Sequence, residues 1–320
     1  MRTIAILKEC KEAEKAMLLS AAAADEVLFF ADEAAMLESG YLDKIDVVFG
    51  EPDMKTIAAM PKLRWIQMTW AGANKYTSDP NYPQAIALTS ASGAFGGVIS
   101  EHIMAGILAL YKNLRAYEAQ LKKGDWQLLS GDDSLEGKRA LILGVGDIGS
   151  NTAKKLQSFG AATVGICRKE RKSLPYFDEL YTTASLDAEL PKADLVILTL
   201  PGTAQTRGLM NEERLSKLNR GAILVNVGRG FVVDTAALTA ALAAKKIRGA
   251  ALDVTDPEPL PEGHPLRNIE NVILTPHVSG ISWGENDLTR QKIIRIFADN
   301  LQRDAKNEPL AHQIDFTQGY

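Results

Sequence analysis

A glycine-rich turn between a predicted strand and a predicted helix is the feature that most constrains this chain. Residues 139–143 form a short apolar run, and Gly144, Gly146 and Gly149 then give the spacing G-x-G-x-x-G at the start of a helical stretch over residues 148–159. In such a turn the glycines allow a tight bend, close approach of the backbone to a pyrophosphate, and close helix packing, while the helix N-terminus points free N–H groups at the phosphates. The spacing alone is weak evidence, because glycine also marks ordinary turns. Placed between a strand and a helix, it predicts a dinucleotide site.

Short apolar runs alternate with helical patterns along most of the 320 residues, which predicts an α/β protein with parallel sheets. The chain is long enough for two domains. The expected strands of the first half are residues 4–7, 27–30, 47–50, 65–69 and 86–89. Those of the second half are residues 139–143, 163–167, 195–200, 222–226, 249–252 and 272–274, as in a doubly wound nucleotide-binding domain. One long helix over residues 98–122 is predicted to bridge the two halves, and a last helix over residues 283–303 follows the final strand.

Composition narrows the class of protein and its partners. With 46% hydrophobic and 24% charged residues and a net charge of −4, the chain resembles ordinary soluble proteins, and it lacks the basic stripe of a nucleic-acid-binding protein. The N-terminal apolar run is too short for a signal sequence or a membrane span, so we expect a cytoplasmic protein with no membrane partner. Cys10 and Cys167 are expected to be reduced, and no cysteine or histidine spacing predicts a metal site.

Three polar motifs each follow the end of a predicted strand. They carry Arg229, Glu258 and His277 within NVGRG (226–230), DVTDPEPLP (253–261) and TPHVSG (275–280). Because ligands bind at the carboxyl edge of an open parallel sheet, these side chains are expected to converge. An arginine fork matches a carboxylate, and a histidine oriented by a carboxylate exchanges a proton near neutral pH. The set therefore predicts reduction of a 2-oxo acid.

These motifs make the chain resemble the D-isomer-specific 2-hydroxyacid dehydrogenases, and among them the glyoxylate/hydroxypyruvate reductases. The resemblance covers nearly the whole chain and also includes GVISEH (97–102), GVGDIG (144–149) and LPGTAQT (200–206). It implies two doubly wound parallel-sheet lobes, with a Rossmann dinucleotide-binding domain inserted in a smaller flavodoxin-like substrate domain. We expect the substrate domain over residues 1–97, the dinucleotide-binding domain over 98–284, and a C-terminal helix over 285–320 that returns to the substrate domain.

The resemblance also implies roles for individual residues. Arg229 would hold the substrate carboxylate, and His277, paired with Glu258, would give a proton to the carbonyl oxygen as NAD(P)H delivers hydride. The substrate loop would comprise Trp70, Ala71, Gly72 and Ala73. His102 fits no catalytic position of the family. The residues expected to contact the cofactor are Gly144, Gly146, Asp147, Ile148, Gly149, Leu200, Pro201, Thr206, Val227, Gly228, Asp253 and Gly280.

The residue after the second strand of the nucleotide domain bears on the choice of cofactor. NAD-preferring sites usually place an acid about 20 positions after the glycines. Here Arg168 and Lys169 open a run of four bases and one acid, which favours the 2'-phosphate of NADP(H). A solvated loop would show the same charges, so NAD(H) stays open.

The substrate loop suggests a small, unphosphorylated acid such as glyoxylate or hydroxypyruvate. Only Lys75 brings a positive charge near this loop, whereas the phosphate of phosphoglycerate would call for more cations. Phosphoglycerate dehydrogenase activity is kept as the alternative. Trp70 and Trp283 are candidates for the pocket wall, although tryptophans packed at a domain junction would look the same. A different class of function is a corepressor-like nucleotide sensor on the same fold. Apolar residues on several faces of the predicted helix over residues 98–122 suggest a homodimer, with residues 126–134 contributing.

Overall fold

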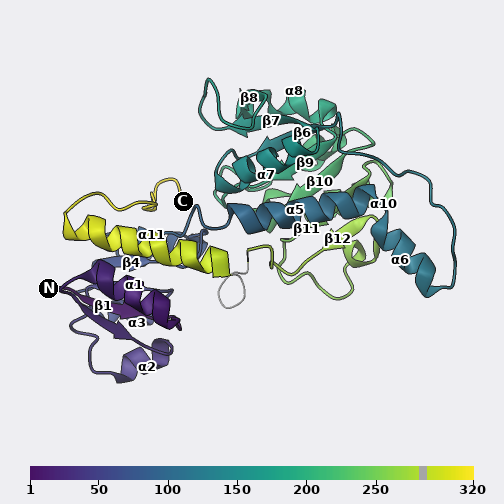
Figure 1. Ribbon diagram of the computed structural model, residues 1–320. Coiled ribbons are helices and arrows are strands. Elements are labelled where there is room, and N and C mark those ends of the chain that lie inside the picture. The colour runs from purple at the N-terminus through teal and green to yellow at the C-terminus, as the bar shows by residue number, and fades with distance from the viewer. Residues whose placement is uncertain (281–286) are drawn as a thin grey trace. The chain divides into compact units, whose positions relative to one another are not determined.

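The computed structural model describes residues 1–280 and 287–320 and divides the chain into two compact units. Unit 1 comprises Met1–Ala94 and Ser282–Tyr320, and unit 2 comprises Phe95–Ile281, so unit 2 is inserted in the sequence of unit 1. Figure 1 shows the helices and strands of each unit. Trp283 and the predicted boundary at residues 284 and 285 lie outside the described residues.

Unit 1 contains a five-stranded parallel sheet in the order β2-β1-β3-β4-β5, which is the flavodoxin-like order. Its strands are apolar runs, as expected of parallel strands covered on both faces. The strands are β1 (Thr3–Ile6), β2 (Glu26–Phe29), β3 (Val47–Phe49), β4 (Trp65–Gln67) and β5 (Ala87–Thr89).

The helices of unit 1 include one from the C-terminal part of the chain. They are α1 (Glu12–Ala22), α2 (Glu33–Glu38), α3 (Met54–Ala58), α4 (Asn74–Thr77) and α11 (Asp287–Ala305). Phe297 of α11 stacks on Phe49 of β3, with 4.6 Å between the ring centroids. Arg290 of α11 donates from Nε to the buried Glu14 of α1 at 2.7 Å. These contacts make α11 part of the core of unit 1, and Figure 1 shows it in yellow beside α1.

Unit 2 contains a seven-stranded parallel sheet in the order β12-β11-β10-β9-β6-β7-β8. The chain reverses its direction of winding between β6 and β9, as in a Rossmann fold. The predicted α/β class, with a Rossmann domain inserted in a flavodoxin-like one, is confirmed. The strands are β6 (Arg139–Leu143), β7 (Ala162–Cys167), β8 (Glu179–Thr182), β9 (Leu195–Leu198), β10 (Ile223–Asn226), β11 (Gly249–Leu252) and β12 (Val272–Leu274). Strand β8 was not predicted, because this half-buried edge strand mixes polar and apolar residues.

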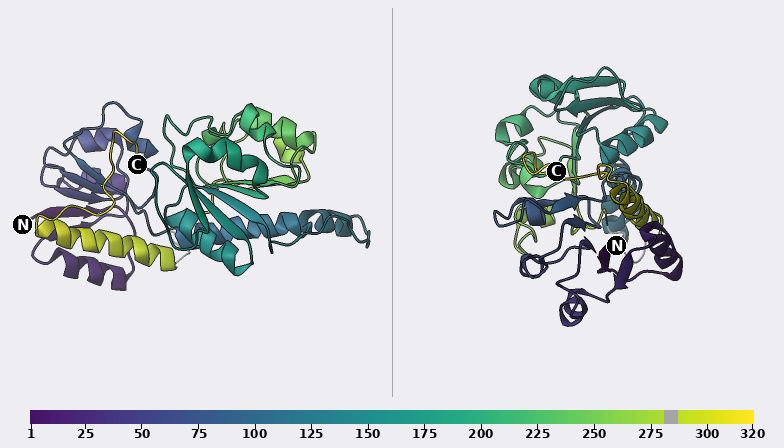
Figure 2. Two further views of the ribbon diagram at one scale, coloured as in Figure 1. Left: turned by 90° about the horizontal axis from the view of Figure 1, so that it is seen from above. Right: turned by 90° about the vertical axis from the view of Figure 1, so that its left-hand side faces the viewer.

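The predicted helix over residues 98–122 is wrong in one respect, because it is two helices. These are α5 (Gly96–Tyr111) and α6 (Leu114–Lys122), and the chain breaks at Asn113, whose φ of 51° is left-handed. Asparagine tolerates that conformation, and the helical pattern continues on both sides, so the sequence hid the break. Figure 2 shows α6 projecting from the body of unit 2. The other helices of unit 2 are α7 (Asp147–Ser158), α8 (Leu186–Glu189), α9 (Glu212–Ser216) and α10 (Thr235–Ala243), with 3-10 turns at Thr183–Ser185, Leu190–Lys192, Gly230–Val232 and Pro265–Asn268.

No helix among residues 1–280 and 287–320 combines the length and apolar character needed to cross a membrane. Cys10 and Cys167 are buried free thiols. Within the same residues, no group of three or more metal-ligating side chains lies together.

Candidate active site

The glycine turn between β6 and α7 has three glycines with three different surroundings. Gly144 has a φ of +100°, which side chains rarely adopt, and a Cβ on Gly149 would lie 2.0 Å from the carbonyl oxygen of Gly144. A Cβ on Gly146, at the exposed N-terminus of α7, would meet no atom within 4 Å. The first and third glycines are therefore required by the turn itself, whereas the second leaves open space beside free backbone N–H groups. Such a cradle fits a pyrophosphate.

The two predicted residues between the glycines differ in their contacts. The carboxylate of Asp147 accepts hydrogen bonds from the backbone N–H of Gly96 at 2.7 Å and from Nδ2 of Asn151 at 3.0 Å. It therefore joins the start of α5 to α7. Ile148 is half-buried in the first turn of α7.

Arg168 and Lys169 follow β7 directly, at the carboxyl edge of the sheet. Both side chains are exposed, as are those of Arg171 and Lys172 farther along the loop. This is the edge at which ligands bind in open parallel sheets, next to the strand that precedes the glycine turn. The loop therefore presents positive charge where the ribose of a dinucleotide would be expected.

The other predicted cofactor residues lie in the loops that follow β9, β10 and β12, except Asp253, which follows β11. A Cβ on Gly228 would lie 2.6 Å from the carbonyl oxygen of Leu200, so the loops after β10 and β9 approach closely only because residue 228 is glycine. Oγ1 of Thr206 donates to the carbonyl oxygen of Pro201 at 2.8 Å. Val227 is buried, and Gly280 is half-buried near Phe95 and Ile99. These residues line the same edge as the glycine turn.

His277 and Glu258 meet although they come from different loops. Nδ1 of His277 lies 2.6 Å from Oε1 of Glu258, and their side chains are 46% and 40% exposed. His277 has a φ of 56°, so its backbone is left-handed. A histidine whose Nδ1–H donates to a carboxylate has a fixed tautomer and an oriented ring. The pair is thus accessible and suited to proton transfer through Nε2.

Arg229 is close enough to Glu258 for their charges to interact. Burial lowers the pKa of Arg229, and the negative charge of Glu258 opposes that shift. Nη1 of Arg229 donates to the carbonyl oxygen of Gly228 at 2.7 Å. A Cβ on Gly230 would lie 1.8 Å from the carbonyl oxygen of Thr255, so the loop that carries Arg229 packs tightly on the one that carries Glu258. Unit 2 therefore brings all three predicted catalytic residues to one edge of its sheet.

The predicted substrate loop belongs to unit 1 and lies between β4 and α4. Its backbone is anchored at the carbonyl oxygen of Trp70, which accepts from the N–H of Ala91 at 2.8 Å. The Trp70 side chain is 48% exposed, Ala71 and Gly72 are half-buried, and Ala73 is buried at the start of α4. An exposed indole beside a short small-residue turn is suited to contact a ligand.

Comparison with known proteins identifies the family. The model of the D-isomer specific 2-hydroxyacid dehydrogenase NAD binding domain matches residues 104–279, more than half of the chain. The chain belongs to this family. The family prediction is therefore confirmed, and with it the class of NAD(P)-dependent 2-hydroxyacid dehydrogenases.

Relatives extend this similarity beyond unit 2. A glyoxylate reductase from Thermofilum pendens is 33% identical over 262 residues, which cover 80% of this chain and 76% of that protein. The crystal structure of a family member from Aeromonas salmonicida superposes with a TM-score of 0.86 at 31% identity, covering 98% of this chain and 99% of the other. The NADPH-dependent glyoxylate/hydroxypyruvate reductase of Sinorhizobium meliloti, solved with NADP and sulfate, gives a TM-score of 0.84 at 27% identity and covers both chains fully, 100% of each.

The structure of this 2-hydroxyacid dehydrogenase also shows a polar cluster that the sequence did not reveal. The carboxylate of Asp253, 2% exposed, accepts from Oγ1 of Thr275 at 2.6 Å and from the N–H groups of Val278 and Ser279 at 2.9 Å each. Burial by itself would raise the pKa of Asp253, but hydrogen bonds from Ser279, Thr275 and Val278 outweigh burial and lower it. Its carboxylate thus holds the loop of His277, and contact with a nicotinamide stays a prediction.

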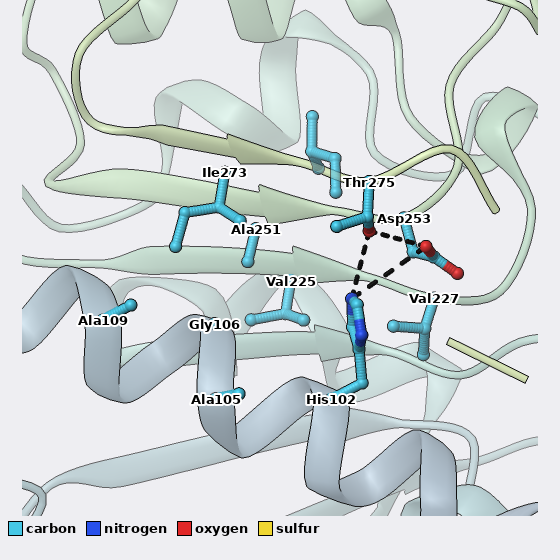
Figure 3. Close-up of a pocket in the computed structure, with 11 residues that line it drawn as sticks. His102, Ala105, Gly106, Ala109, Val225, Val227, Ala251, Asp253, Ile273 and Thr275 are labelled. Atoms are coloured by element: carbon cyan, nitrogen blue, oxygen red, sulfur yellow. Dashed lines mark hydrogen bonds and ion pairs between the residues drawn. The ribbon is translucent and has the colours of Figure 1, made fainter. Parts of the chain in front are cut away.

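His102, which fits none of the predicted catalytic positions, belongs to the same polar cluster. Its Nε2 lies 3.1 Å from Oγ1 of Thr275, and its ring borders a cavity of about 270 Å³ between α5 and the sheet (Figure 3). The two residues are 173 positions apart, so no local pattern could have joined them. The other lining residues are Ala105, Gly106, Ala109, Val225, Val227, Ala251, Leu252, Asp253, Ile273 and Thr275.

Proposed function

We propose that this dehydrogenase reduces a small, unphosphorylated 2-oxo acid, of the size of glyoxylate or hydroxypyruvate, to the D-2-hydroxy acid. The observation that carries the proposal is the 2.6 Å contact of His277 with Glu258, next to the partly buried Arg229. The glyoxylate reductase of Thermofilum pendens, at 33% identity, supports the size of the substrate.

In the proposed reaction Arg229, His277 and Glu258 each have a separate task. A bound reduced nicotinamide dinucleotide supplies the hydride. Arg229 pairs with the substrate carboxylate, because its planar fork matches two oxygens and its burial strengthens the attraction. His277 gives the proton on Nε2 to the carbonyl oxygen, and Glu258 stabilises the imidazolium through Nδ1–H. In the reverse direction His277 acts as the base.

We also propose Trp70, Ala71, Gly72 and Ala73 as substrate-binding residues. The one nearby cation that the sequence offers, Lys75, is held by Oδ1 of Asp53 at 2.9 Å and donates to the carbonyl oxygen of Glu51 at 2.8 Å. An ammonium group already compensated by a carboxylate is a weak partner for a substrate phosphate. This supports an unphosphorylated acid over phosphoglycerate.

The preferred cofactor in this proposal is NADP(H). Arg168 and Lys169 stand directly after β7, where an NAD-specific site would place a carboxylate. A 2'-phosphate would gain charge-assisted hydrogen bonds there, whereas the ribose hydroxyls of NAD would find no acceptor on these side chains. The Sinorhizobium meliloti enzyme with NADP bound is a structural neighbour consistent with this preference.

We propose a homodimer formed through the helical region over residues 98–122, which includes α6, with the segment over residues 126–134 contributing. No residue of α6 is buried within the chain, and Leu114 and Leu121 are each 56% exposed. Trp126 and Leu128 are 88% and 92% exposed in the segment that follows. So many exposed apolar side chains in one projection mark an interaction surface. Sedimentation of the chain should give twice the monomer mass, and a monomer at micromolar concentration would contradict the dimer.

An oxidation assay tests the catalytic proposal. NADPH and NADH are compared, by loss of their absorbance, against glyoxylate, hydroxypyruvate, pyruvate, a branched 2-oxo acid and phosphohydroxypyruvate. Oxidation of NADPH by one of the two small acids is expected. Chiral analysis of the product from hydroxypyruvate should give the D isomer, whereas the product from glyoxylate is achiral. Faster turnover of the phosphorylated acid would contradict the substrate class. Nucleotide binding without oxidation of any acid would favour a sensor.

A further inference from the structure

We infer that His102 is a positioning residue for His277 and acts through Thr275 and Asp253. The inference rests on the proposed function, in which His277 is the proton donor. His102 itself is on α5 and touches neither Glu258 nor His277 in any contact of the described residues. Its effect would be carried by the polar cluster shown in Figure 3.

Counting hydrogens assigns a direction to the contacts of this cluster. The hydroxyl of Thr275 has one hydrogen, which it donates to Oδ1 of Asp253 at 2.6 Å. At the 3.1 Å contact with His102, Oγ1 of Thr275 must therefore accept, so Nε2 of His102 carries a hydrogen and donates it. The direct separation of His102 Nε2 from Asp253 Oδ1 is longer, 4.0 Å, so Thr275 relays the contact.

Asp253 in turn holds the backbone around His277 through hydrogen bonds. Its carbonyl oxygen accepts from the N–H of His277 at 2.8 Å, and its carboxylate accepts from Val278 and Ser279 at 2.9 Å each. One residue thus binds three successive N–H groups. His277 has a left-handed backbone, with a φ of 56°, a conformation that a non-glycine residue keeps only where its surroundings hold it. The direction in which the imidazole points therefore depends on these bonds.

Among the residues that the structure describes, no other side chain donates a hydrogen bond to the Thr275 hydroxyl. On the cavity side the ring is next to the small or apolar residues Ala105, Gly106 and Val225. Without the imidazole, the Thr275 hydroxyl is free to rotate, and its bond to Asp253 competes with water entering the cavity. A shift of His277 by a fraction of an ångström is enough to slow proton transfer.

The test compares four variants of the full chain: His102→Leu, His102→Gln, Thr275→Val, and the double variant that combines His102→Leu with Thr275→Val. Glutamine keeps an N–H near the position of Nε2, whereas leucine fills the space without a donor. We expect His102→Leu to lower kcat about tenfold with an unchanged KM for NADPH, and His102→Gln to restore most of the loss. The double variant should be no slower than Thr275→Val, because both changes break one chain of contacts.

Hydrogen exchange of the wild type and His102→Leu provides a readout that does not need activity. Peptides that contain residues 277–279 should exchange about tenfold faster in His102→Leu, while those over residues 144–149 stay unchanged. Equal kcat losses for leucine and glutamine, additive losses in the double variant, or unchanged exchange at residues 277–279 would each overturn the inference. A wild type that reduces no 2-oxo acid defeats the proposed function instead, and the exchange experiment then decides alone whether His102 holds this loop.

Discussion

His277 and Glu258 are 19 residues apart in sequence, yet Nδ1 of the histidine lies 2.6 Å from Oε1 of the glutamate. The contact engages one ring nitrogen, so the proposed proton transfer would use the other, Nε2. It forms because the loops that follow β11 and β12 meet at the carboxyl edge of the sheet of unit 2. The geometry gives the two residues different tasks, which separate variants can distinguish.

Replacing His277 by alanine should remove the proton donor without disturbing the glycine turn. We expect kcat for the best 2-oxo acid to fall by roughly 10²–10⁴-fold. The dissociation constant for NADPH, measured by quenching of protein fluorescence, should stay within about twofold of the wild type, because Gly144, Gly146 and Gly149 are untouched. Glu258→Gln is the matched change, since it keeps the shape of the side chain but removes its charge. It should lower kcat less than His277→Ala does. Full activity of the alanine variant would remove His277 from the mechanism.

The second and third glycines of the turn should respond differently to alanine. In Gly149→Ala the new Cβ would lie 2.0 Å from the carbonyl oxygen of Gly144. We therefore expect the free energy of unfolding to fall by about 3 kcal/mol. In Gly146→Ala the Cβ meets no atom within 4 Å, and stability should stay close to that of the wild type. The methyl group of Gly146→Ala would instead occupy the space proposed for the pyrophosphate, and it should weaken NADPH binding about tenfold or more. Thermal melting and NADPH titration of both variants check this, and tight binding by Gly146→Ala would place the pyrophosphate elsewhere.

The charge at residue 168 should set the cofactor preference. Arg168→Asp removes a partner of the 2'-phosphate and adds an acceptor for ribose hydroxyls, so kcat/KM for NADPH should fall on the order of tenfold to a hundredfold while that for NADH rises. Lys172→Asp is the control, because it makes the same change of charge in the same exposed loop four residues farther from β7. If both variants shift the NADPH to NADH ratio equally, the general field of the loop, rather than a contact with Arg168, sets the preference.

The sequence predicted the parallel sheets, the glycine turn and the residues of the proposed proton donor pair, because each shows as a local pattern. Apolar runs define strands such as β6 and β9, and the turn chemistry around Gly144 depends on neighbours in the chain. The break at Asn113 was missed, since a left-handed residue between two helical patterns leaves little trace. His102 was missed for another reason: its partner Thr275 comes from β12 and its loop, and only the folded sheet brings them together. Contacts between distant side chains depend on packing that no local pattern encodes.

Acid should destabilise unit 2 partly through Glu179 of β8. A hydrogen bond from Arg139, and a second one from Tyr181, lower the pKa of Glu179 to about 2. In the unfolded chain a glutamate has a pKa of about 4.3, so the unfolded state takes up the proton first as the pH falls. The stabilising contribution of Glu179 is therefore complete above about pH 4.3 and is lost as the pH falls toward about 2.

The variant Glu179→Gln cannot titrate at this position and isolates that contribution. Its melting temperature should lie below that of the wild type at pH 6, and the difference should shrink as the pH is lowered from about 5 to about 3. Glu262→Gln, at an exposed glutamate of the loop after β11, is the control and should follow the wild type throughout. Because the Glu179 side chain is 40% exposed, salt should also reduce the difference at pH 6. A gap between wild type and Glu179→Gln that stays constant from pH 6 to pH 3 would mean that the ion pair with Arg139 does not stabilise the folded state.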